Sequence, residues 1–263
     1  MRPAVLPRPY CPLNRAGESR IVRTMKDIFL ADAHLRDPAD ANYRRMLRFL
    51  DEQRGQIRTL YLLGDIFDFW VGYRHVVFSA CVPLLDCLRR LRASGAELVY
   101  VEGNHDFNLG PYFGDVLGCR ILPDGGAVDL DGKKVFIAHG DLANPDDAGY
   151  RLLRRFLRSA PTKGLIKLLP PDWTWAIGRW SSNRSSHGHN ADQQRWIPEA
   201  LLLAHARERF AEGFAAVVTG HYHFPLQCTT EQGTMVALGD WIEQYSYATW
   251  EEGNFTLHTY EAE

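Results

Sequence analysis

The sequence lacks several features that would define its class at once. No run of about 18 or more apolar residues is present, so no transmembrane helix is expected. The five cysteines are odd in number and form no Cys-x-x-Cys pair, which argues against a disulfide framework and against a thiolate zinc site. Such cysteine usage suits a reducing cytosol. With a formal net charge of -2, the chain has no global attraction to nucleic acid or to a membrane surface.

The first 24 residues contain prolines and arginines but lack the apolar core of a signal peptide. We expect residues 1–24 to be a flexible leader and residues 25–263 to form the folded domain. Met25 stands directly before the first predicted strand and is a candidate translation start. The length of 263 residues suits one large α/β domain, or a domain with a sizeable insertion.

The first half of the chain alternates between two kinds of hydrophobic pattern. Short apolar runs at 27–31, 60–63 and 97–101 predict buried strands, and the segments 41–53 and 76–94 show helical spacing between them. This repeated order of strand, helix and strand indicates a parallel sheet with right-handed crossovers.

The second half of the chain has a different pattern. Asp131-Gly132 between two apolar runs predicts a hairpin. We interpret residues of about 146–195, which are rich in arginine and tryptophan, as an inserted helical cap. A helix at 198–213 leads to a strand at 215–219, and short antiparallel strands follow at 226–230, 234–238, 245–250 and 254–260.

Five predicted strands each end in side chains that can bind a metal. These clusters are Asp32 with His34, Asp65 alone, Asn104 with His105 and Asp106, His139 alone, and His221 with His223. A single Asp-x-His or a lone histidine is typical of an ordinary surface loop. Five such clusters are different, because the carboxyl ends of neighbouring parallel strands meet at one edge of a sheet. The sequence therefore predicts a metal site.

The types of candidate ligand narrow the choice of metal ion. Carboxylate, imidazole and amide oxygen without thiolate suit divalent Mn, Fe or Zn. Seven candidate ligands exceed the need of one tetrahedral ion, and they suit two ions about 3.5–4 Å apart that share a carboxylate. Asp65 is the natural bridge, because its strand should lie near the middle of the site. Two such ions activate water and neutralise a phosphoryl group, so the predicted chemistry is hydrolysis of a phosphoester or phosphoanhydride.

The five clusters, with their adjacent glycines and with Asp68 and Asp141, resemble the ordered blocks of the calcineurin-like metallophosphoesterases from about residue 27 to residue 240. The resemblance implies an α/β fold, a four-layer αββα sandwich. It implies one metal held by Asp32, His34, Asp65 and His223, and a second held by Asp65, Asn104, His139 and His221. It also implies that His105 faces the phosphate as general acid or charge stabiliser, with Asp106 orienting it.

A narrower resemblance concerns residues 64–70 and the segment from His139 to Arg151. Both are similar to the branch of this family that cleaves UDP-2,3-diacylglucosamine in lipid A biosynthesis. This implies attack on the α-phosphorus, with release of UMP and 2,3-diacylglucosamine 1-phosphate. The implied substrate contacts are Asn104, His105, Asp147, Tyr150 and His221. The implied location is the cytoplasmic face of the inner membrane, as a peripheral monomer or homodimer that holds two divalent ions, Mn first among them.

The sequence departs from that branch at two places. His105 stands where the typical enzyme has Arg, and a histidine better serves a leaving group that needs a proton. The serine-rich run 181–186 does not match the branch's Ser, Asn or Thr, and Lys pattern. A related enzyme for another lipid or nucleotide diphosphate, or for a phosphodiester, therefore remains the alternative. A non-catalytic scaffold is a remote alternative, because such scaffolds usually have eroded ligand sets, and nucleic acid is not the expected partner.

The cap has a composition of its own. Between residues 151 and 184 it carries eight Lys or Arg against one acid, Asp172, and four of the arginines fall on one helical face: Arg151, Arg154, Arg155 and Arg158. That face is either solvated or attracts an anionic lipid or diphosphate. An apolar strip accompanies it: Leu165, Ile166, Leu168, Leu169, Trp173, Trp175, Ile177 and Trp180. The strip is cap core, an acyl-chain chamber, a membrane-facing surface or a platform for stacking bases. His187 and His189 are expected to be loop residues and not ligands.

Overall fold

The computed structural model describes residues 25–189 and 198–261, and of these the side chains of 181–189 are not described. The expected leader at 1–24, the side chains of the serine-rich run, and those of His187 and His189 therefore lie outside the described part. In the described helices, none is long and apolar enough to cross a membrane.

The first sheet has six strands, in the order β11-β10-β1-β2-β3-β4. Four of its strands are parallel: β1 (Lys26–Leu30), β2 (Ile57–Leu62), β3 (Glu97–Val101) and β4 (Arg120–Leu122). The strands β10 (Ser246–Glu251) and β11 (Asn254–Thr259) add antiparallel on the β1 side. The predicted parallel arrangement is confirmed, and it aligns the carboxyl ends of β1, β2 and β3.

A second sheet has the order β5-β6-β7-β9-β8. Its members are β5 (Gly126–Leu130), β6 (Lys133–Ala138), β7 (Ala216–Thr219), β9 (Thr234–Ala237) and β8 (Leu226–Thr229). β6, β7 and β9 are parallel, whereas β5 and β8 are antiparallel edge strands. The hairpin between β5 and β6 closes at Asp131 and Gly132, which both have positive φ, as an Asp-Gly turn requires.

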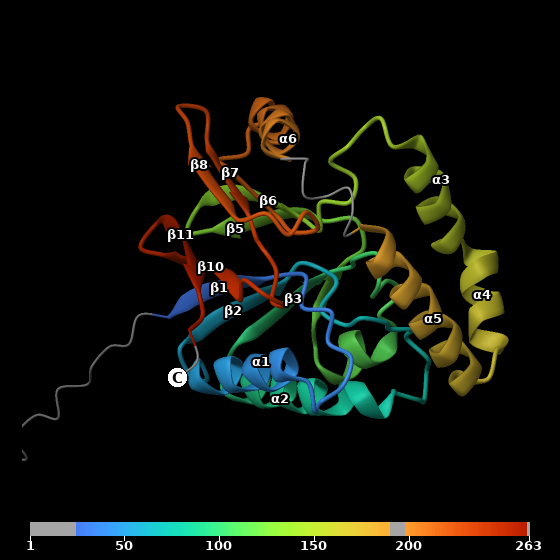
Figure 1. The fold of residues 1–263 in the computed structure, drawn as a ribbon. Helices are drawn as coiled ribbons and strands as arrows, with labels where there is room; N and C mark the ends of the chain where they lie inside the picture. Colours follow the sequence, from blue (N-terminus) through green and yellow to red (C-terminus); the bar gives the residue numbers. More distant parts are fainter. Residues whose placement is uncertain (1–24, 190–197, 262–263) are drawn as a thin grey trace, which may run out of the picture.

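The two sheets pack face to face and helices cover their outer faces, which makes four layers (Figure 1). Between the sheets, Phe29 and Val99 of the first meet Val135 and Val218 of the second in one buried cluster. The helices α1 (Ala41–Glu52) and α2 (Val82–Ala93) bury apolar residues against the first sheet, and α6 (Glu199–Ala211) does so against the second. The chain is buried on both faces of its central strands, which explains their continuous apolar runs. The expected αββα class is confirmed.

Three helices follow β6 and stand beside the sandwich in Figure 1: α3 (Ala148–Leu157), α4 (Ala160–Leu168) and α5 (Pro171–His189). They occupy the segment that the sequence marks as a cap. Two single-turn elements, η1 (Ser79–Cys81) and η2 (Tyr112–Val116), precede α2 and β4.

The cap docks on the sandwich through one side of α5. A Cβ on Gly178 would come within 2.3 Å of the Phe69 ring, so only glycine allows this close approach. Trp175 stacks near Phe78, with ring centroids 4.6 Å apart. The Tyr73 hydroxyl hydrogen-bonds with the Thr174 hydroxyl and lies 3.2 Å from the Leu169 carbonyl oxygen. Part of the apolar strip is thus cap core.

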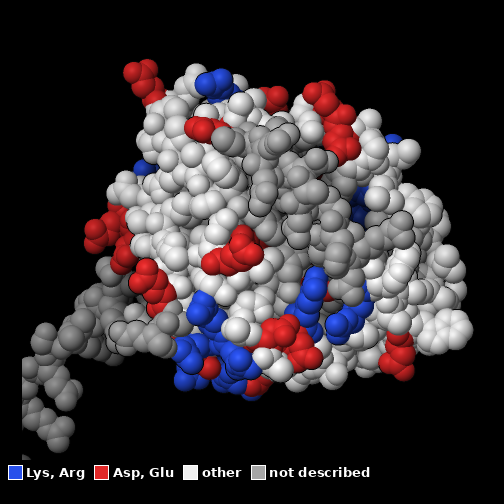
Figure 2. Space-filling view, viewed as in Figure 1, with Lys and Arg blue, Asp and Glu red and all other residues white. Residues whose placement is uncertain are grey.

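The rest of the strip is exposed. Leu168 is 82% exposed and Trp173 is 65% exposed. The large apolar residues exposed on the three cap helices are Leu152, Leu153, Phe156, Leu165, Leu168, Trp173, Ile177 and Trp180. In Figure 2 the cap side of the molecule, at the right of the view, shows mainly uncharged atoms. The strip therefore divides into three half-buried residues, Ile166, Leu169 and Trp175, and five exposed ones, which the helical spacing of its residues alone could not assign.

Candidate metal centre

The five strand ends meet at one place, where the loops after β1, β2 and β3 of the first sheet face those after β6 and β7 of the second. Three groups of side chains have ligand atoms within 4.8 Å of one another: Asp32 with His34 and His223, His34 with Asp65 and His105, and Asp32 with Asp65 and His139. Asn104 and His221 join through His139, whose Nε2 lies 3.0 Å from Asn104 Oδ1 and 3.2 Å from His221 Nδ1. All seven expected ligands are brought together.

Unusual backbone conformations present these side chains. Five of the expected ligands have positive φ, between 43° and 73°: Asp32, His34, Asp65, His221 and His223. Such left-handed residues cost free energy and cluster at functional sites. Glycines provide the close approach that the loops need, because a Cβ on Gly103 would come within 2.2 Å of Asp65 Oδ1 and one on Gly220 within 2.5 Å of Asp32 Oδ2.

Asp32 has one carboxylate oxygen without a hydrogen-bond partner. Its Oδ2 accepts a hydrogen bond from the His221 amide at 2.7 Å, whereas its fully buried Oδ1 has none and lies 3.6 Å from His223 Nε2. A buried anionic oxygen without a donor is costly unless a cation completes it. The donor set therefore fits a metal ion between Asp32, His34 and His223.

Asp65 faces both halves of the site. Its Oδ1 accepts a hydrogen bond from the His105 amide at 2.9 Å. Its Oδ2 lies 3.8 Å from His34 Nε2 and 3.6 Å from His139 Nε2. One oxygen is therefore turned toward a ligand of each expected ion, as a bridging carboxylate would be.

The protonation states suit a cation site. Burial lowers the pKa of His34 and of His221 to about 4, so both imidazoles are neutral at neutral pH. Burial would lower the pKa of His139 as well, but the carboxylates of Asp65, Asp32 and Asp141 raise it to about 9. Burial would raise the pKa of Asp65, but its imidazole neighbours outweigh burial and hold that pKa below its usual range. A proton on His139 thus supplies positive charge that a metal would supply instead.

Asp106 and His105 are neighbours in sequence but not partners in the described hydrogen bonds. The buried Asp106 carboxylate accepts hydrogen bonds from the amides of Gly103, Asp65, Ile66 and Phe67 and from the Tyr100 hydroxyl. His105 Nδ1 instead lies 2.9 Å from the carbonyl oxygen of Asp68. The resemblance implies that Asp106 orients His105. In the structure Asp106 ties the loop after β2 to the loop after β3, and so holds the backbone that carries His105, while the Asp68 carbonyl oxygen contacts the ring itself.

The two expected substrate residues on the cap differ in position. The Tyr150 hydroxyl donates to Asp141 Oδ2 at 2.6 Å, and the Tyr150 ring centroid lies 6.3 Å from that of His221. Tyr150 thus borders the metal cluster. Asp147 is exposed and caps α3, where its Oδ1 accepts a hydrogen bond from the Tyr150 amide at 2.9 Å.

The arginine face of α3 is only partly exposed to solvent. Arg154 Nε lies 2.6 Å from Asp141 Oδ2, and Arg158 Nη1 lies 3.1 Å from Glu102 Oε2. These two arginines therefore point at buried acids of the sandwich, neither solvated nor turned to a lipid. These two ion pairs were not predicted from the sequence. The one sequence feature that could have indicated them is the acid Glu102, directly after β3.

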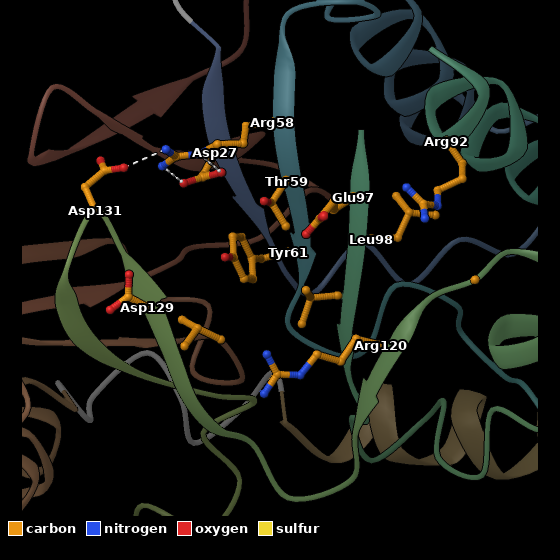
Figure 3. Close-up of a pocket in the computed structure, with 13 residues that line it drawn as sticks. Asp27, Arg58, Thr59, Tyr61, Arg92, Glu97, Leu98, Arg120, Asp129 and Asp131 are labelled. Atoms are coloured by element: carbon orange, nitrogen blue, oxygen red, sulfur yellow. Dashed lines mark hydrogen bonds and ion pairs between the residues drawn. The ribbon is translucent and has the colours of Figure 1, made fainter. Parts of the chain in front are cut away.

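A cavity of about 670 Å³ lies at the opposite end of the strands (Figure 3). It is lined by residues near the starts of β1, β2, β3 and β4, and Arg58 bridges Asp27 and Asp131 across it. No expected ligand lines it. It is therefore separate from the metal cluster, and the single guanidinium of Arg58 compensates only part of the charge of the two carboxylates.

Two packed sheets with carboxylates and imidazoles gathered at their shared edge define a metal-dependent phosphoester hydrolase. Residues 25–225 match the family described as calcineurin-like phosphoesterase. The chain belongs to that family, as its five blocks predict.

Curated relatives resemble most of the chain. The UDP-2,3-diacylglucosamine hydrolase of Stenotrophomonas maltophilia is 32% identical over 250 residues, which cover 89% of this chain and 98% of the relative. The enzyme of the same name from Pseudomonas paraeruginosa is 31% identical, with 84% and 92% covered. That from Neisseria meningitidis serogroup B is also 31% identical, with 83% and 90% covered. The similarity spans the cap as well as the sandwich.

Proposed function

We propose that this phosphohydrolase cleaves the diphosphate of UDP-2,3-diacylglucosamine to UMP and 2,3-diacylglucosamine 1-phosphate. The observation that carries the proposal is the similarity to relatives named for this substrate over nine-tenths or more of their length. The complete ligand set at the shared edge of the sheets supports it.

The site would hold two divalent ions, with Mn the first candidate and Fe or Zn the alternatives. Asp32, His34 and His223 would hold one, Asn104, His139 and His221 the other, and Asp65 both. Bound there, the ions supply Lewis acidity for the phosphoryl group and an activated water. The loops that follow the strands of both sheets position these ligands.

His105 is the residue we assign to proton transfer or charge stabilisation. A carbonyl oxygen only accepts hydrogen bonds, so the contact with Asp68 puts a hydrogen on Nδ1 and leaves Nε2 as the working nitrogen. Nε2 can then donate to a phosphoryl or leaving-group oxygen when it is protonated. Tyr150 and His221 border the same space and would contact substrate, and Asp147, at the start of α3, would do so from the rim of the cap.

The exposed apolar surface of the cap suits an acylated substrate at a membrane. Tryptophan and leucine side chains exposed together on three helices are typical of surfaces that enter the lipid interface. With such a substrate, we propose that the protein acts at the cytoplasmic face of the inner membrane, as a peripheral monomer or homodimer.

The test is an assay of UMP release from UDP-2,3-diacylglucosamine beside hydrolysis of bis(p-nitrophenyl) phosphate, with Mn²⁺ present. Release of UMP at a rate well above that of the generic ester is expected. Turnover of the generic ester without UMP release would favour the second candidate, another diphosphate or phosphodiester. His105 favours the phosphodiester, because the alkoxide that leaves from a phosphodiester needs the proton that a histidine provides, whereas the phosphate that leaves from a diphosphate does not. No hydrolysis of either compound by metal-loaded protein would favour a scaffold.

A further inference from the structure

Arg158 connects the cap to the loop that carries Asn104 and His105. Its Nη2 donates to the carbonyl oxygens of Gly103 at 2.7 Å and Glu102 at 3.3 Å. Its Nη1 donates to Glu102 Oε2 at 3.1 Å and to the Pro123 carbonyl oxygen at 2.6 Å. The side chain is only 11% exposed. One guanidinium from α3 thus holds the two carbonyl groups directly before Asn104.

Glu102, at the start of this loop, also contacts the end of the loop. Its Oε1 accepts a hydrogen bond from the Leu109 amide at 3.0 Å, while its Oε2 pairs with Arg158. The segment 102–109 is therefore fastened at both ends by one buried ion pair. Both Asn104 and His105 lie between the two fastening points.

A second contact from α3 reaches the neighbouring block. Arg154 Nε and the Tyr150 hydroxyl both donate to Asp141 Oδ2 at 2.6 Å. Asp141 lies two residues after His139. Helix α3 therefore supports the loops of Asn104 and His139, whose side chains meet at 3.0 Å.

The other half of the cluster has no such support. Among the described residues, the hydrogen bonds and ion pairs of Asp32, His34 and His223 run to loops of the sandwich, including those of Asp65 and Asp240, and none reaches α3. Helix α3 thus makes hydrogen bonds with the ligand loops of one half only, and that half meets the other at the shared Asp65, whose Oδ1 accepts a hydrogen bond from the His105 amide.

We propose that Arg158 is a positioning residue for the ion held by Asn104, His139 and His221, and that it has little effect on the ion held by Asp32, His34 and His223. The inference rests on the two-ion site proposed above. Groups that orient metal ligands from behind typically change metal affinity by about 10- to 100-fold. The planar fork of arginine suits this role, because one guanidinium can hold several carbonyl oxygens in fixed directions.

The test is titration of metal-free full-length protein with Mn²⁺ by calorimetry, together with electron paramagnetic resonance. Wild-type protein is expected to bind two ions and to show the spectrum of a coupled Mn pair. Arg158→Ala should bind the first ion with wild-type affinity and the second about 10- to 100-fold more weakly, so that the isolated-Mn spectrum persists at two equivalents. Arg155→Ala is the matched control on the same helix, since Arg155 is exposed and makes no hydrogen bond or ion pair to the described residues. It should behave as wild type.

Arg158→Lys keeps the test decisive if the alanine variant does not fold. It retains the charge but loses the fork, so it should weaken the second ion by less than Arg158→Ala would. Equal weakening of both ions, or wild-type affinity for both in a folded Arg158 variant, would overturn the inference. Wild-type protein that binds a single ion would instead overturn the two-ion site, so the two failures are distinguishable.

Discussion

At the scale of single residues, Asp65 has the most demanding position in the metal centre. It is buried, its backbone is left-handed, and one of its oxygens faces a histidine from each half of the site. A shorter or neutral side chain there would remove charge from both halves together. Asp106 cannot replace it, because its carboxylate accepts hydrogen bonds from the backbone amides of Asp65 and Ile66.

Asp65→Ala is expected to reduce hydrolysis to below detection and to lower Mn content toward zero, because both ions lose a shared anionic ligand. Steady-state assays and elemental analysis of the purified variant would measure the two effects. Full activity in folded Asp65→Ala would refute the bridging role.

His105→Ala separates catalysis from metal binding. If His105 transfers a proton, kcat should fall by about 10²- to 10⁴-fold while two ions remain bound. The ring also lies in one group with His34 and Asp65, so ligation by His105 is the competing assignment. Loss of an ion from His105→Ala would establish that assignment in place of ours.

The pH dependence of metal binding should follow His139. Its pKa in the metal-free protein is raised to about 9, so at pH 7 the site holds a proton that a metal must displace. Apparent Mn²⁺ affinity should therefore rise about tenfold per pH unit between pH 7 and 9 and level off above that pKa. Calorimetry in buffers of different ionisation enthalpy would count the released proton, and a pH-independent affinity would contradict the assignment.

At the scale of elements, α3 has its polar and apolar faces reversed relative to a usual surface helix. Arg154 and Arg158 face the sandwich, whereas Leu152, Leu153 and Phe156 are exposed. A usual amphipathic helix of a globular protein buries its apolar face. This reversed orientation is stable because an acid of the sandwich pairs with each arginine, Asp141 with Arg154 and Glu102 with Arg158.

The exposed apolar residues of the cap should bind lipid. Replacing Leu168 and Trp173 by serine is expected to weaken co-sedimentation with phosphatidylglycerol vesicles at least about tenfold, because one fully buried side chain of this size contributes about 1.5–3 kcal/mol. Val82→Ser, at an exposed apolar position of the sandwich, is the control and should bind as wild type does. Unchanged binding by the double variant would remove the cap from the membrane contact.

The sequence predicts the strands, and the gathering of the polar residues at their ends, better than it predicts which face of a helix turns inward. The runs ending at Asp32, Asp65 and Asn104 are apolar on both faces, and this is the pattern of a buried parallel strand whose polar end lies at a site. The partners of Arg154 and Arg158 could not be found in the same way. Helical spacing identifies a common face, but Glu102 and Asp141 meet that face only through the folded chain.

At the scale of the whole molecule, the metal centre joins the two sheets. Asp32, Asp65 and Asn104 follow strands of the first sheet, whereas His139 and His221 follow strands of the second. An ion held by both sets would connect the layers at a point where their loops carry left-handed backbone. Metal binding should therefore stabilise the fold as a unit.

Mn²⁺ is expected to raise the Tm of the metal-free protein. A ligand at 100 times its Kd that binds only the folded state contributes about 2.7 kcal/mol, which corresponds to about 5–11 °C for a domain of this size. Scanning calorimetry with and without Mn²⁺ would measure the shift, with Mg²⁺ at equal ionic strength as a control for salt. A Tm that does not respond to Mn²⁺ would contradict a site that joins both sheets.

The inward arginines of α3 make the cap an inseparable part of this domain. Excising it would remove the hydrogen bonds of Arg158 to the loop before Asn104 and those of Arg154 and Tyr150 to Asp141, and would uncover both acids beside the ligand loops. The segment is therefore not a module that can be transplanted or lost by deletion of the helices alone.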